Sequence, residues 1–154
     1  LRVQETIHLR HELGEVKESG FRRDRWQAII AAFPLTRVEL LARHVKDLLA
    51  DIHPLGPLCH FDRIRDTAGV GLYLAFTDRL TRNLFPELAP AVDNFLRTGD
   101  WAILARAVAA GRSAARRYAD ILVAAYDDAE SRDDLARLPE NVDRRMGRFF
   151  DGGG

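Results

Sequence analysis

The sequence has only one cysteine, Cys59, and this scarcity excludes several classes of protein. One thiol cannot build a framework of intramolecular disulfides, and it cannot supply a cysteine-rich zinc site. Apolar runs are short as well. The longest uncharged run, around Ala68–Asp78, is about half the ~20 apolar residues that a membrane span needs. No basic segment followed by an apolar one marks a signal peptide. We therefore expect a cytoplasmic protein with no membrane segment.

Signatures of common catalytic sites are also missing. The sequence contains neither the Gly-x-x-x-x-Gly-Lys pattern of phosphate loops nor the Gly-x-Ser-x-Gly pattern of nucleophile elbows. The 23 basic and 23 acidic residues balance, so the whole chain has no net attraction for nucleic acid. Only two of the basic residues are lysines, an arginine excess that we interpret as GC-rich bacterial coding. Interspersed acidic residues predict that most arginines form local ion pairs.

Length and composition predict one globular domain. The chain has 154 residues, of which 47% are hydrophobic and 30% are charged. Proline and glycine divide it into segments with helical periodicity. We expect an all-α, single-domain helical bundle of about five to seven helices over residues 1–150, followed by a flexible glycine-rich tail at 151–154. The helices are predicted at about 2–18, 24–33, 36–52, 62–85, 87–96, 101–128 and 141–150.

Two of these helices are predicted to shape the core. The helix at 62–85 follows a loop at 54–58 and is apolar on every face between Ala68 and Phe76, which predicts a buried central helix around Leu72. A short strand at 70–76 is the alternative. The long helix of the C-terminal half, 101–128, begins after a capping Asp100 and has a seam of small residues centred on Gly111.

The first helix has metal-ligand chemistry on one side. His8, His11 and Glu15 are spaced by three and four residues, and they lie opposite the apolar stripe that includes Leu9 and Val16. A solvated polar face is the simplest interpretation. The alternative is a haem or divalent-metal site built from His8, His11 and Glu15, as in a metal-dependent bundle enzyme. By fold-level analogy with haem-oxygenase-like bundles, His11 would face a glycine-rich helix.

Our leading hypothesis is a non-catalytic interaction or regulatory module. The small-residue seam and the apolar Phe149–Phe150 pair favour association with another protein or a second copy, with room for a small apolar ligand. The residues assigned to ligand or partner binding are Gly69, Gly71, Tyr73, Gly111, Ala115 and Tyr118. A DNA-binding regulator is a further alternative, because 68–76 resembles the end of a TetR-type unit. That segment lacks a polar, basic reading helix, which argues against nucleic acid.

Overall fold

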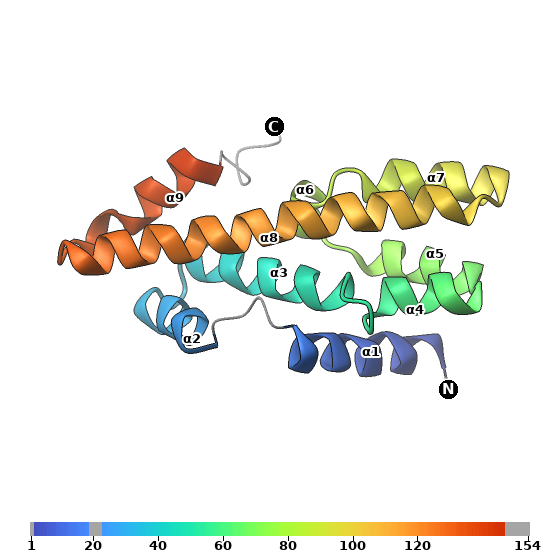
Figure 1. Cartoon of the computed structure of the whole chain (residues 1–154), viewed down its shortest axis with the longest axis horizontal. Coiled ribbons are helices and arrows are strands. Elements are labelled where there is room, and N and C mark those ends of the chain that lie inside the picture. The colour runs from blue at the N-terminus through green and yellow to red at the C-terminus, as the bar shows by residue number, and fades with distance from the viewer. Residues whose placement is uncertain (1, 19–22, 147–154) are drawn as a thin grey trace.

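The computed structural model describes residues 2–18 and 23–146, and within these ranges the chain is all-α. Nine α-helices and one 3-10 turn follow one another without a strand in the described part (Figure 1). The helices are α1 (Val3–Lys17), α2 (Arg23–Ala32), α3 (Arg37–Asp51), α4 (Pro57–Ile64), α5 (Thr67–Phe76), α6 (Arg79–Leu84), α7 (Leu88–Thr98), α8 (Trp101–Ser131) and α9 (Leu138–Met146). The count exceeds the five to seven that we expected from the sequence.

The long helix α8 spans the molecule from end to end (Figure 1). Helices α3 and α4 follow its direction in the middle of the molecule, and α1 lies on the side of α3 that faces away from α8 (Figure 1). Helix α2 contacts both α3 and α8. Helices α7 and α9 pack on opposite halves of α8. Among the described helices, none is both long and apolar enough to cross a membrane.

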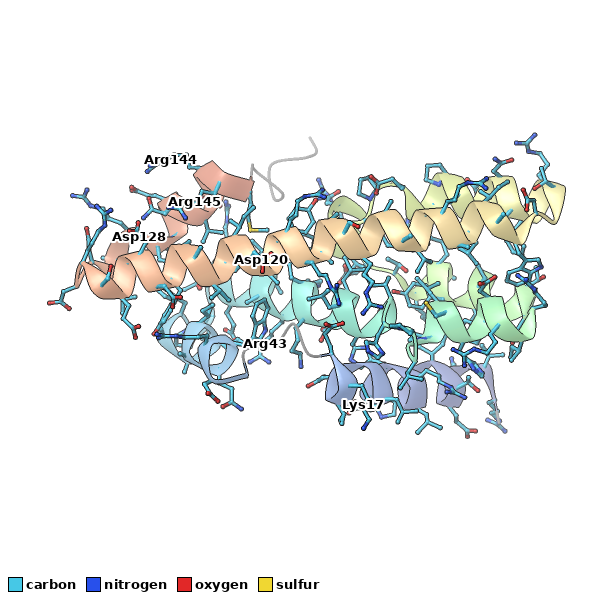
Figure 2. All side chains as sticks on the ribbon, viewed as in Figure 1. Lys17, Arg43, Asp120, Asp128, Arg144 and Arg145 are labelled. Carbon is cyan, nitrogen blue, oxygen red and sulfur yellow. The ribbon has the colours of Figure 1, made fainter. Side chains whose placement is uncertain are left out.

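Side-chain caps explain where several helices begin. The Thr36 hydroxyl accepts a hydrogen bond from the Glu39 backbone N–H at 3.4 Å, as the sequence predicts for the start of α3. Asp100 caps α8 by accepting from the Ala102 N–H at 2.9 Å, which is also as predicted. An ion pair rather than a cap connects the last described helix to α8. Arg145 Nη2 on α9 lies 3.7 Å from Asp128 Oδ2 on α8 (Figure 2).

The prediction of one helix over residues 62–85 is wrong, because this part of the chain forms three shorter helices, α4, α5 and α6. Helix α4 already begins at Pro57, inside the predicted loop, and ends at Arg65, whose φ of 58° is left-handed. Asp66 then caps α5 and Asp78 caps α6. Short polar residues that bond to nearby backbone N–H groups start new helices at both places.

The buried central helix is therefore not the one that we predicted. In α5 only Gly69, Val70 and Tyr73 are buried, Leu72 is half-buried and the Phe76 side chain is 64% exposed. The central helix is α3, which contacts helices on several sides and buries a stripe from Val38 to Ala50. Uniform apolarity on the short α5 does not lead to burial, because one of its faces has no neighbouring helix.

The seam of α8 is buried within this chain. Leu104, Ala115 and Leu122 are at most 1% exposed, and a Cβ added to Gly111 would lie 2.5 Å from the Phe85 ring. The chain's own helices thus cover the small residues that suggested self-association. Phe149, Phe150 and the tail at 151–154 lie outside the described residues.

Candidate functional site

Helix α1 packs part of its polar side against the protein, which differs from the sequence prediction of a solvated polar face. Leu9 is 48% exposed and Val16 is 62% exposed, whereas His11 is partly buried and Gly14 is buried. Part of the apolar stripe thus lies on the outer face, and the packed face combines His11 and Gly14 with the apolar Ile7. Of the polar face that we expected to be solvated, His8 is exposed, whereas His11 and Glu15 are partly buried.

Gly14 explains this orientation, because it allows α1 to approach the backbone of α3. A Cβ at Gly14 would overlap the Ala50 carbonyl oxygen and would lie 2.8 Å from the carbonyl carbon. No side chain fits at this crossing. The residues that flank the crossing are His11 and Glu15 on α1, and Asp47 and Asp51 on α3. The close approach therefore brings these four side chains together.

The Asp51 carboxylate accepts two hydrogen bonds from different helices. One oxygen lies 2.8 Å from His11 Nδ1, and the other accepts from the Tyr73 hydroxyl at 2.7 Å. Because an ionised carboxylate is an acceptor only, the proton of His11 must be on Nδ1. Asp51 is 16% exposed on its side chain, so these bonds form in partial shelter from water.

This arrangement shifts the pKa values of both donors. The hydrogen bond with Asp51 raises the pKa of His11, against the opposing effect of burial. Burial raises the pKa of Tyr73 well above its ordinary value, and the negative charge of Asp51 raises it further. Tyr73 thus stays a protonated hydroxyl, and His11 holds a second proton more firmly than a free histidine.

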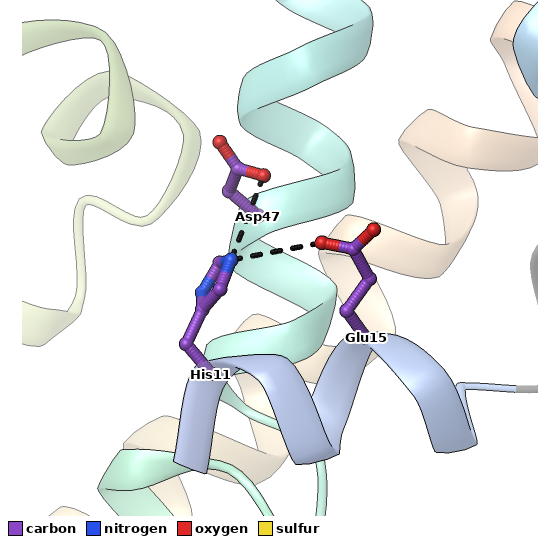
Figure 3. A group of neighbouring side chains, drawn as sticks. All are labelled: His11, Glu15 and Asp47. Carbon is purple, nitrogen blue, oxygen red and sulfur yellow. Dashed lines mark ion pairs between the residues drawn. The ribbon is translucent and has the colours of Figure 1, made fainter. Parts of the chain in front are cut away.

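The other ring nitrogen of His11 faces two carboxylates (Figure 3). His11 Nε2 lies 3.8 Å from Glu15 Oε2 and 3.9 Å from Asp47 Oδ1. Lys46 Nζ lies 2.9 Å from the second oxygen of Glu15. The pKa of Asp47 is raised overall, because the effect of burial exceeds the lowering by the charges of His11 and Lys46. We call His11, Glu15 and Asp47 the His11 cluster.

A second histidine–carboxylate pair lies nearby on the same side of α3. His44 Nε2 is 2.7 Å from Asp78 Oδ2, and His44 Nδ1 is 2.8 Å from the Leu40 carbonyl oxygen. Burial tends to raise the pKa of Asp78, but hydrogen bonds from Thr81 and His44 lower it overall. This pair connects α3 to the start of α6.

A cavity of about 410 Å³ opens beside these pairs, between α1, α5 and α6. Its volume is within the range of small-molecule sites. Its lining is shared between apolar and polar side chains, and Asp51, His11 and Tyr73 contribute to its wall. The full lining is Gln4, Ile7, His8, His11, Asp51, Tyr73, Phe76, Thr77, Asp78 and Thr81.

Of the residues predicted for haem or metal, the structure places His11 and Glu15 in the cluster. His8 is exposed and lines the cavity one turn away. Two of the three glycines in the haem hypothesis face aromatic rings: a Cβ at Gly69 would lie 2.5 Å from the Phe61 ring, and Gly111 faces Phe85, whereas Gly71 has no atom within 4 Å of an added Cβ. This packing gives the haem hypothesis no support.

The residues predicted for ligand or partner binding are scattered. Tyr73 lines the cavity, and Gly71 has no atom within 4 Å of an added Cβ. Ala115 is fully buried, and Tyr118 is half-buried on α8, where burial raises its pKa. Only Tyr73 in this group lies at the cavity.

The contributions of α3 and α6 to the site were not predicted from the sequence. His44, Asp47 and Asp51 are separated by three and four residues, so a helix at this position places them on one side. That spacing indicates a polar face on α3. The same helix also has the apolar stripe that packs in the core. Asp78 had no comparable signal, because its role depends on the helix break at 76–79.

The lone cysteine is not part of this site. Cys59 is half-buried on α4, and its Sγ lies 3.8 Å from the Ile52 carbonyl oxygen. Burial raises the pKa of this thiol, which keeps it protonated and weakly reactive.

The chain belongs to a family of unknown function, described as the DUF6866 C-terminal domain, whose model matches residues 2–145. Comparison with curated proteins and with solved structures gives no match. The family description assigns no activity, so a function must be argued from the geometry of the site.

Proposed function

We propose that this domain binds a small organic molecule, neutral or cationic, in the cavity between α1, α5 and α6. The observation that carries the proposal is Asp51, which fixes His11 and Tyr73 at the cavity wall through bonds of 2.8 and 2.7 Å. Polar groups held in place before a ligand arrives lose little freedom on binding. A cavity of about 410 Å³ with a few convergent polar groups is typical of a ligand site.

The charges around the cavity favour a cationic or neutral ligand over an anionic one. Its lining includes two carboxylates, Asp51 and Asp78, and no lysine or arginine. Each carboxylate has one imidazole partner, His11 or His44. Among the described residues that line the cavity, none has a permanent positive charge that would hold an anion. The exposed ring of Phe76 adds an apolar surface at the rim. These features support binding of an amine or a neutral polar molecule.

Association with another protein or a second copy of the chain remains a prediction, but one of the features that suggested it no longer supports it. The α8 seam is packed against the chain's own helices, so it gives no free surface for a partner. A ligand-regulated interaction module is still compatible with the proposal. Light scattering with size-exclusion chromatography tests self-association directly, and a strict monomer at high concentration contradicts it.

Two probes of matched shape and opposite charge test the ligand proposal. Benzylamine and benzoate are titrated into ¹⁵N-labelled protein, and amide shifts are followed. We expect benzylamine to move resonances of α1, α5 and α6 with a millimolar Kd, in the range of a small fragment, or about −4 kcal/mol, and benzoate to move none.

The matched control compares two aspartates. Asp51→Asn keeps the shape of the side chain but removes its charge, and we expect it to weaken the benzylamine response. Asp93→Asn on the exposed face of α7 should leave that response unchanged. Shifts that map elsewhere, or equal responses to both probes, would contradict the proposal.

A further inference from the structure

We propose that the His11 cluster is a binding site for one divalent metal cation, held by His11 Nε2 and by one carboxylate oxygen each of Glu15 and Asp47. The site lies on the opposite edge of the His11 ring from Asp51, and Glu15 and Asp47 do not line the cavity. The two proposed sites share the His11 ring and its support from Asp51, but Glu15 and Asp47 belong to the metal site alone.

The spacing of the ligand atoms supports this assignment. One ligand atom from each of His11, Glu15 and Asp47 lies within 4.8 Å of the other two. Typical metal–ligand distances of about 2.0–2.2 Å require a modest rotation of the two carboxylates to close around an ion. His11 and Glu15 are one turn apart on α1, and Asp47 comes from α3. The Gly14 crossing fixes these two helices against each other.

Asp51 provides a second observation from outside the cluster. It holds one proton of His11 on Nδ1, so a metal ion that displaces the second proton meets the Nε2 lone pair on the side of Glu15 and Asp47. Histidines that bind metals almost always donate their other N–H in this way, to a carboxylate or carbonyl. The Tyr73 hydroxyl holds the remaining Asp51 oxygen, so the outer support extends to a third helix.

The charges of the network point to a cation of charge two. Glu15, Asp47 and Asp51 are three carboxylates, and among the described residues Lys46 is the one permanent positive charge that pairs with any of them. With His11 neutral, a divalent ion brings the network to zero net charge. A proton on His11 supplies only half of that compensation, which leaves excess negative charge in a partly buried place.

The ligand set narrows the choice of metal. One imidazole and two carboxylates suit Zn²⁺, Fe²⁺ or Mn²⁺, and the absence of a thiolate from the set disfavours soft ions. Three protein ligands leave at least one position for water, which distinguishes this arrangement from a closed structural zinc site. Zn²⁺ is the probe of choice, because it binds N and O ligands more tightly than Mn²⁺ or Fe²⁺.

Isothermal titration of Zn²⁺ into the untagged chain tests the site. We expect one ion per chain, with affinity lowered at least tenfold by Glu15→Gln and by Asp47→Asn. Asp51→Asn, which removes the outer support, should cost about 10–100-fold. The matched controls are Glu12→Gln and His8→Gln on the exposed side of α1, and both should bind as the wild type does.

Histidine ¹⁵N chemical shifts provide the second measurement, and circular dichroism verifies that each variant is folded. Zn²⁺ should move the Nε2 resonance of His11 and leave Nδ1 protonated. The proposal is overturned if Zn²⁺ does not bind, if it binds equally to the Glu15→Gln and Asp47→Asn variants, or if His8→Gln removes binding. Binding of benzylamine is measured separately, so failure at the cavity and failure at the His11 cluster are distinguishable.

Discussion

Replacing Gly14 by alanine is the most direct way to perturb the crossing of α1 and α3. The new Cβ would lie 2.8 Å from the Ala50 carbonyl carbon, whereas carbon atoms in contact are about 3.5 Å apart or more. The Cβ is fixed to the backbone of α1 and the carbonyl belongs to the backbone of α3, so α1 must retreat by at least roughly 0.7 Å, and further to clear the carbonyl oxygen that the Cβ overlaps. That retreat lengthens the 2.8 Å bond from His11 to Asp51 to the limit of a hydrogen bond.

The change in the free energy of unfolding caused by Gly14→Ala follows from two opposing effects. Overpacking costs about 1–3 kcal/mol, and replacing a mid-helix glycine by alanine recovers about 0.5–1 kcal/mol. We expect a net loss of about 1–2 kcal/mol in the free energy of unfolding, measured by urea denaturation. We also expect the pKa of His11, followed by NMR titration, to fall toward its ordinary value.

Gly71→Ala is the matched control on α5. No atom lies within 4 Å of a Cβ at Gly71, so the substitution gains helix propensity without a clash. It should stabilise the protein by about 0.5–1 kcal/mol and leave the His11 titration unchanged. If Gly14→Ala is as stable as Gly71→Ala, with an unaltered His11 pKa, the close approach does not hold the site together.

Three further predictions concern single contacts of the site. Because the pKa of His11 is raised in the folded state, its stabilising contribution is complete below the unfolded pKa of about 6.5 and is lost as pH rises through the folded pKa. Denaturation at several pH values should show the stability gap between wild type and His11→Gln shrinking with rising pH, and a growing gap would contradict the assignment. Tyr73→Phe removes a buried hydroxyl bound to a carboxylate and should cost about 1.5–3 kcal/mol in urea denaturation; a neutral effect would mean that the bond does not form. Lys46→Met removes the ammonium group 2.9 Å from Glu15 and should tighten Zn²⁺ binding in calorimetry, whereas weaker binding would show that Lys46 supports the site.

The long helix and the caps could be read from the sequence because their causes are local. The period of α8 and the short polar side chains at Thr36 and Asp100 act within a few residues of chain. The break at Arg65–Asp66 also has a local cause, the Asp66 cap, but the unbroken apolar spacing across it hid the signal. Burial of α5 was not predictable in the same way, because it depends on which helices pack beside it.

The orientation of α1 shows why the site itself was harder to predict than the fold. Hydrophobic burial favours a helix that turns Leu9 and Val16 inward, since each buried side chain stabilises by about 1.5–3 kcal/mol. The structure instead exposes both and packs the face with His11 and Glu15 against α3. That choice is reasonable only when the neighbouring helix offers matching polar groups, here Asp47 and Asp51, and a backbone close enough to reach. Complementarity between two helices forty residues apart is a property of the pair. Sequence periodicity describes each helix alone, so it identifies the polar face of α1 but not the polar partner that makes this face a site.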